Sequence, residues 1–257
     1  VVLFKDANLE KAIRDALGIP TELLKKEDLA GLKEFNHDGR KAGEIVDLTG
    51  LEHCANLTHI SLIYSQISDL SPISNLNKLQ VIELNVNSIS DLSPLKKFDN
   101  LVTLAFGSNK IVDISPLKNL TNLRALYLSS NQISDISALS KCTNLYRLAI
   151  DHNKLITDIS PLAELTKLEK LYLQGNQISD ITPLKKLSNL ETLWLSDNSI
   201  SDIVSLNDLK LIGSDKSEPD AWFAASDLDL NYNKVSDITP LVENKGLSGI
   251  VFLKGNP

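Results

Sequence analysis

The sequence has no methionine, only two cysteines, and no apolar run near the roughly 18 residues that suggest a membrane span. Val1 is not followed by the charged and apolar segments of a signal peptide. Because the sequence contains no methionine, we expect a mature or trimmed fragment. The formal net charge is −7 and no cationic stripe is visible, which argues against a nucleic-acid partner. The composition is otherwise that of a globular chain.

Motifs of common catalytic sites are also missing. G-x-S-x-G, a P-loop, C-x-x-C and H-E-x-x-H do not occur. The four histidines, His37, His53, His59 and His152, are scattered along the chain. His53 is next to Cys54, but no third residue completes a catalytic constellation. We therefore expect a protein that is not an enzyme and that needs no cofactor.

What is present is an internal repeat, L-x-x-L-x-L-x-x-N-x-I-x-D-I-x-P-L-x-x-L. Its units begin at Leu57, Leu79, Leu101, Leu123, Leu145, Leu168 and Leu190, in steps of 22 residues with one step of 23. An eighth unit follows an insertion at 213–225, and a partial ninth ends the chain. One such unit cannot close a core alone, so the units must stack into a curved solenoid.

The first half of each unit alternates with period two, which predicts a short strand whose fourth and sixth residues point inward. The strands of stacked units should lie parallel on the concave face. An asparagine recurs at the ninth position, as Asn87, Asn109, Asn131, Asn153, Asn176, Asn198 and Asn233, whereas the first unit has Ser65 there. We expect these amides to form a buried ladder with backbone groups of neighbouring turns.

The second half of each unit predicts a short helical or 3-10 turn. Ser or Thr followed by Pro is typical of an N-cap and first helical residue. Aspartate recurs two residues earlier, as Asp47, Asp69, Asp91, Asp113, Asp135, Asp158, Asp180, Asp202 and Asp237. We expect these carboxylates to accept backbone N–H bonds, so the acidic charge belongs mostly to the scaffold.

Before the repeats, "FKDANLEKAIRDALG" has helical spacing of apolar residues at Phe4, Leu9, Ala12, Ile13 and Leu17. Asp6 or Asn8 is the expected cap, and Gly18 with Pro20 ends the helix. The first, degenerate repeat extends back to Phe35, with Ile45, Asp47, Leu48, Leu51 and Cys54 at the expected positions.

With "LxxLxLxxNxISDISPL" in 22-residue steps and this helical start, the chain resembles the internalin-type leucine-rich repeats of bacterial surface proteins. The resemblance implies an α/β right-handed solenoid with parallel strands on the concave face and 3-10 turns on the convex face. It implies a helical N-terminal cap over 1–34 and a solenoid over 35–257. It also implies an extracellular or cell-wall-attached bacterial protein whose repeats bind a macromolecule.

Cys54 and Cys142 both occupy the 20th position of their units, four rungs apart. At roughly 4.8 Å per rung they are about 19 Å apart, too far for a disulfide. We therefore expect two buried thiols that replace leucine.

The fifth strand position points outward, where the scaffold does not dictate the residue. It is small or polar in the first units and aromatic later, at Tyr127, Tyr172 and Trp194. Together with charged and aromatic neighbours this is the composition of an interaction hot spot. The candidate partner-binding residues are Tyr127, Arg147, Asp151, Lys170, Tyr172, Trp194, Asp229, Tyr232 and Phe252. The alternative is that neighbouring rings only pack on each other.

The expected partner is a protein held by the concave face, and the alternatives are a glycan or a spacer role in which the patch touches a neighbouring domain. Asp197, Asp227 and Asp229 could hold Ca²⁺, but a solvated acidic rim is the favoured interpretation. Trp222 and Phe223 of the insertion either anchor it on the solenoid or form a wall of the site.

Overall fold

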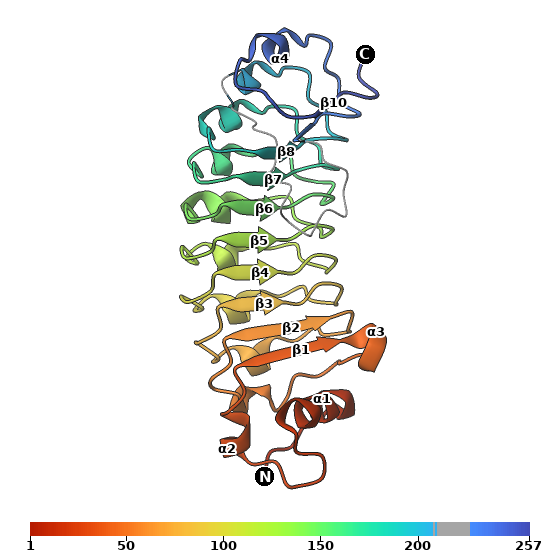
Figure 1. The fold of residues 1–257 in the computed structure, drawn as a ribbon, viewed down its shortest axis with the longest axis vertical. Coiled ribbons are helices and arrows are strands. Elements are labelled where there is room, and N and C mark those ends of the chain that lie inside the picture. The colour runs from red at the N-terminus through yellow and green to blue at the C-terminus, as the bar shows by residue number, and fades with distance from the viewer. Residues whose placement is uncertain (208, 210–226) are drawn as a thin grey trace. The chain divides into compact units, whose positions relative to one another are not determined.

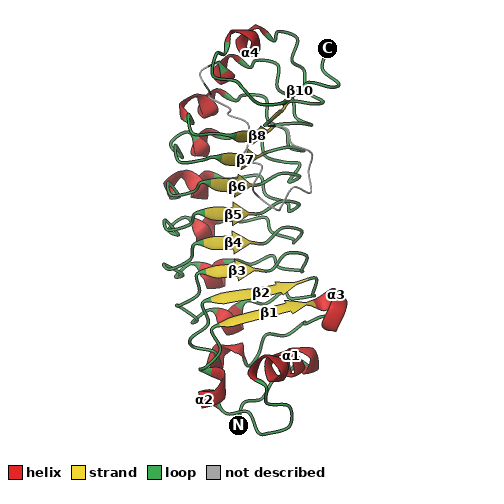
Figure 2. Ribbon diagram, viewed as in Figure 1, coloured by secondary structure: helices red, strands yellow, loops and turns green. Residues whose placement is uncertain are grey.

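The computed structural model describes residues 1–207, 209 and 227–257, which form two compact units, Val1–Leu123 and Arg124–Pro257. Figure 1 shows the course of the chain. The insertion predicted at 213–225, with Trp222 and Phe223, lies outside the described residues. Each unit is a stack of leucine-rich repeats, with parallel strands on one side and 3-10 helices in the returning segments (Figure 2).

The first unit begins with helix α1 (Ala7–Leu17), as the sequence predicts. Asp6 rather than Asn8 is its cap: one carboxylate oxygen accepts from the backbone N–H groups of Asn8 and Leu9. The second oxygen accepts from Val46 N at 2.7 Å, which ties the helix to the first repeat. Gly18 ends the helix in the left-handed region that a glycine adopts without strain.

The rest of the first unit consists of short elements. The helices are α2 (Lys26–Leu29), α3 (Gly39–Ala42), η1 (Leu51–His53), η2 (Ser71–Ile73), η3 (Ser93–Leu95) and η4 (Ser115–Leu117). The strands are β1 (Glu34–Asp38), β2 (His59–Ile63), β3 (Val81–Glu83) and β4 (Thr103–Ala105), paired in parallel in chain order. The extension of the first repeat to Phe35 is confirmed, because Phe35 lies buried in β1 opposite Ile60.

The second unit repeats this plan. Its strands are β5 (Ala125–Tyr127), β6 (Arg147–Ala149), β7 (Lys170–Tyr172), β8 (Thr192–Trp194), β9 (Leu228–Asp229) and β10 (Val251–Phe252), again parallel and in order. Its helices are η5 (Ser137–Lys141), η6 (Ser160–Leu162), η7 (Thr182–Lys186), η8 (Val204–Leu206) and α4 (Thr239–Glu243). Equivalent repeat positions therefore face each other across every described strand pair.

The asparagine ladder is confirmed. Asn109 accepts from Ile89 N at 2.9 Å and donates to Leu84 O at 2.9 Å and Phe106 O at 3.0 Å. In the repeat that begins at Leu57, the hydroxyl of Ser65 takes the acceptor role and accepts from Ile45 N at 3.2 Å. Each amide thus satisfies backbone groups that would otherwise be buried without partners, which costs about 1–3 kcal/mol per group.

The predicted Ser/Thr N-cap is wrong, and the aspartate does that work. Helix η3 begins at Ser93 itself, and no side chain caps it from the preceding position Leu92. Instead Asp91 accepts from Ser93 N and from Ser93 Oγ, both at 2.8 Å. These bonds hold the pKa of the Asp91 carboxyl below its usual value. The same aspartate contacts recur along both units, which confirms the expected scaffold role.

Both cysteines are buried thiols outside any disulfide, as predicted. Burial raises the pKa of Cys54 to about 12 and that of Cys142 to about 11, because a thiolate would lose its hydration. Each occupies a core position that leucine fills in other repeats, with no exposed surface.

Candidate binding face

The strand face of the second unit, defined here as the outward side chains on β5 to β10, carries the predicted aromatic residues. Tyr172 and Trp194 are directly opposite in the β7–β8 pair. Their ring centroids are 5.0 Å apart at an interplanar angle of 85°, an edge-to-face contact. Such a pair contributes about 0.5–1.5 kcal/mol beyond its buried area. The rings therefore do pack on each other, yet both stay partly exposed.

Tyr127 is separated from this ring pair by strand β6. Ala149 lies directly across from Tyr127 on one side and from Tyr172 on the other, and it is buried. Arg147 reaches back to Tyr127, its Nη1 donating to the phenol oxygen at 3.1 Å. Lys170 lies beside Arg147 in register, so two cations flank the aromatic residues.

Asp151 is more enclosed than the sequence suggests, since only 9% of it is exposed. It accepts from Ser129 Oγ at 2.5 Å, and its other oxygen lies 3.9 Å from His152 Nε2. Burial raises the pKa of the Asp151 carboxyl, and the Ser129 bond opposes this only in part. The strand pairing continues past it, because His152 N donates to Gln174 O at 2.7 Å.

The carboxylates near the end of the strand face serve the backbone. Asp227 is buried and accepts from Ile250 N at 2.8 Å, and Asp229 accepts from Asn231 N at 2.9 Å. Among the residues that the structure describes, no group of three His, Cys, Asp or Glu side chains could hold a metal ion. The geometry therefore offers no support for the Ca²⁺ alternative.

Tyr232 and Phe252 are the most exposed of the candidate residues, at 52% and 38%. The Tyr232 ring lies against Gly255, where an added Cβ would collide with it, and Lys254 Nζ lies 5.8 Å from the ring centroid. Seven of the nine candidates thus lie on β5 to β10, whereas Asp151 and Tyr232 follow β6 and β9. Asp151 is the least accessible of the nine.

The eighth repeat position has a role that the sequence pattern did not reveal. In the repeats from Leu57 onward it follows the strand with a left-handed backbone, φ between 53° and 58° at non-glycine residues. These residues are Tyr64, Val86, Ser108, Ser130, His152, Asp197 and Tyr232, and Gly175 and Gly255 complete the series. The turn sends the side chain sideways over the next repeat, so that His152 covers Gly175. The only sequence signal is the glycine at two of these positions.

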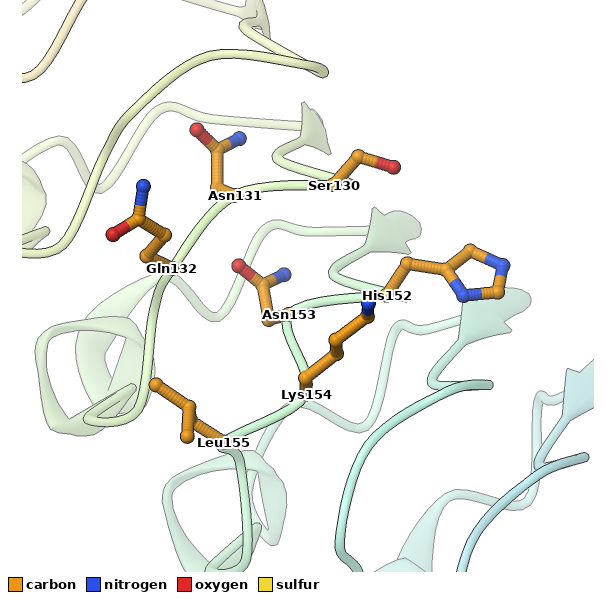
Figure 3. A pocket seen from close by; sticks show the side chains of 7 residues that line it. All are labelled: Ser130, Asn131, Gln132, His152, Asn153, Lys154 and Leu155. Carbon is orange, nitrogen blue, oxygen red and sulfur yellow. The ribbon is translucent and has the colours of Figure 1, made fainter.

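A pocket of about 680 Å³ opens beside this turn in the second unit. It is lined by Ser130, Asn131, Gln132, His152, Asn153, Lys154 and Leu155 (Figure 3). Lys154 and Leu155 belong to the repeat with 23 residues, and the sequence analysis did not select these two residues as candidates. The lining contains one lysine, one histidine and no carboxylate, in a chain whose formal net charge is −7.

Comparison with known proteins agrees with this architecture. The family described as Leucine Rich repeats (2 copies) matches residues 77–119, 121–164 and 166–210, slightly more than half of the chain. The chain therefore belongs to the leucine-rich-repeat family. Internalin C2 from Listeria monocytogenes is 37% identical, with 81% of this chain and 91% of that chain covered and a TM-score of 0.77. Within the family, the chain is internalin-like.

Two further structures extend the comparison. An internalin (InlF) from Listeria monocytogenes is 29% identical, covering 98% of this chain and 83% of that chain, with a TM-score of 0.59. The ectodomain of the receptor kinase GASSHO1/SCHENGEN3 from Arabidopsis thaliana, in complex with CASPARIAN STRIP INTEGRITY FACTOR 2, is 23% identical. It covers 81% of this chain and 26% of that chain with a TM-score of 0.65, a likeness of fold alone. A search of curated proteins found no match.

The leucine-rich-repeat fold is typically a protein-interaction module. Two of the similar structures are internalins, in agreement with the resemblance seen in the sequence. No helix in the described part of the chain has the length and apolar character needed to cross a membrane.

Proposed function

We propose that the chain is a non-enzymatic protein-binding module of a bacterial surface or secreted protein. The observation that carries this proposal is the Tyr172–Trp194 pair, two large rings held edge to face on outward positions of adjacent strands. Rigid aromatic side chains supply contact area at a low cost in conformational entropy, which suits recognition.

The surroundings of the ring pair support a protein partner. Arg147 and Lys170 provide cations on one side of the rings, and Tyr232 and Phe252 extend the apolar contact area on the later strands. Aromatic residues with arginine are the types that dominate interaction hot spots. The internalin relatives support an extracellular or wall-attached location, and the receptor ectodomain in complex with CASPARIAN STRIP INTEGRITY FACTOR 2 is a protein of this fold that holds a partner.

The test is a capture experiment in which the protein is immobilised on a surface and exposed to a mixture of host-cell surface proteins. Trp194→Ala and Tyr172→Ala should capture at least tenfold less of any protein that the parent retains, because a hot-spot ring contributes about 2 kcal/mol or more. Glu83→Ala is the matched control, since Glu83 has the same repeat position in the first unit. Unchanged capture by both ring variants would refute the proposed face.

A glycan array probed with the parent and the same three variants tests the alternative that the chain binds a carbohydrate. Selective sugar signals that disappear with Trp194→Ala would favour carbohydrate recognition, because aromatic faces also stack on sugars. Silence on the array together with ring-dependent protein capture supports the protein-binding proposal.

A further inference from the structure

The repeat that begins at Leu145 departs from the regular geometry in a way that has a structural cost. Its ninth residue, Asn153, accepts from Ile133 N at 3.0 Å, like the other ladder amides. The next residue is Lys154, which adopts a left-handed backbone at φ 63°, a conformation that L side chains rarely take. Its N–H donates forward to Gly175 O at 3.2 Å, whereas Lys234 at the same position donates back to Ile200 O.

The next repeat, which begins at Leu168, contains a second irregularity at its ladder residue Asn176. Asn176 donates to Ile150 O and Leu173 O as its equivalents do, at 3.1 and 2.9 Å. Its side-chain oxygen, however, is buried and makes no hydrogen bond to any described residue. In the regular repeats this oxygen accepts from the isoleucine N–H two residues after the previous ladder asparagine. The extra residue displaces that donor.

The pocket of about 680 Å³ lies at this irregularity, because Asn153, Lys154 and Leu155 are among its lining residues. Figure 3 shows Lys154 extending toward His152 on one side of the pocket, with Leu155 on the other. Half of Leu155 is exposed, although the regular repeats turn the apolar residue that follows the asparagine into the core. The backbone of Lys154 stays bonded to the next repeat, since its carbonyl also accepts from Gln177 Nε2 at 2.6 Å. The exposed Leu155 and the unbonded Asn176 oxygen remain unexplained by the scaffold, and departures of this kind concentrate at functional sites.

We infer that this pocket is a subsite for a partner segment in which an acidic side chain neighbours an apolar one. The inference rests on the proposed function and adds the chemistry of one contact. Lys154 and the imidazole of His152 can donate to a carboxylate, and Leu155 offers apolar surface beside them. The Asp151 carboxylate, 3.9 Å from His152 Nε2, is enclosed and bonded to Ser129.

The test is amide NMR of the chain with capped dipeptides of leucine with glutamate, glutamine or lysine as probes. The glutamate peptide should shift the amides of His152 to Ile156, and the glutamine peptide should bind about two- to fivefold more weakly, as expected for an exposed ion pair. Lys154→Gln should remove this preference, whereas Lys234→Gln, at the same repeat position elsewhere, should retain it.

Deletion of Leu155 restores a 22-residue step with the regular order Asn-Lys-Ile. This variant should be more stable than the parent and should lose the peptide shifts. Peptide shifts that persist after the deletion, equal binding of all three peptides, or a deletion variant no more stable than the parent would each overturn the inference. Trp194→Ala should leave the peptide shifts unchanged, so failure of the ring site and failure of the pocket are distinguishable.

Discussion

Asn153 and Asn176 occupy the same position in consecutive repeats and differ by one hydrogen bond. Both amide groups donate to carbonyl oxygens on either side of them. Only Asn153 also accepts, from Ile133 N at 3.0 Å. Replacing each by alanine therefore removes the same donor contacts, and the difference between the two variants isolates the acceptor.

The expected difference follows from that one bond. Asn153→Ala leaves the Ile133 N–H buried without its acceptor, which costs about 1–3 kcal/mol. Asn176→Ala removes an oxygen that accepts from no described residue, so that part of the loss does not arise. We therefore expect Asn153→Ala to lower the free energy of unfolding by about 1–3 kcal/mol more than Asn176→Ala does. In a chain of this size each kcal/mol moves Tm by about 2–4 °C.

Urea unfolding followed by circular dichroism measures this difference, with the denaturant slope compared between variants to confirm that the same surface unfolds. Asn176→Ala in the Leu155 deletion background provides the control. There the regular acceptor bond should be restored, and Asn176→Ala should then cost as much as Asn153→Ala. Equal costs of the two variants in the parent chain would refute the reasoning from the broken ladder.

Three other outcomes follow from the structure. Burial raises the folded-state pKa of Asp151, so the folded chain binds this proton more tightly than the unfolded chain does. The free energy of unfolding of the parent, relative to that of Asp151→Asn, should therefore rise as the pH falls through the raised pKa. A stability difference that stays constant between about pH 7 and 4 would contradict this. Gly175→Ala should destabilise the chain by about 1–2 kcal/mol, because alanine is strained at a φ of 68°. The added Cβ would also collide with the His152 ring, so a double-mutant cycle with His152→Ala should recover that part of the loss. Cys54 and Cys142 should react with a thiol reagent only at the rate of unfolding, and fast reaction of the native chain would exclude their burial.

The regular part of the fold could be predicted from the sequence because each repeated residue has one physical task. Asn109 needs a buried backbone to satisfy, and Asp91 needs the N–H of Ser93, so both patterns predict local geometry directly. The cap at Asp6 is equally local. The assignment of the turn cap to serine failed because Ser93 and Asp91 compete for the same role, and the sequence does not show which oxygen accepts.

The sequence predicts which residues occupy outward positions of the binding face, but it predicts less well how exposed their side chains are. The period-two pattern places Tyr172 and Trp194 on outward positions, but their edge-to-face contact depends on side-chain rotamers that spacing cannot supply. Asp151 also points outward by its position, yet its neighbours enclose it. Helix α3 was missed because Gly39–Ala42 interrupts the first repeat without a repeated signal.

The Tyr172–Trp194 ring pair and the pocket at Lys154 lie close enough for one partner segment to contact both. His152 lies three repeat positions beyond Tyr172 and one strand away, and at about 3.3 Å per residue and 4.8 Å per strand this separates their backbones by roughly 11 Å. An extended segment of about four residues covers that distance. The ring pair can therefore hold an apolar anchor of a partner while the pocket at Lys154 receives an acidic residue of the same segment. On this arrangement the regular repeats set the spacing of the contacts, and the single irregular repeat adds the charge preference.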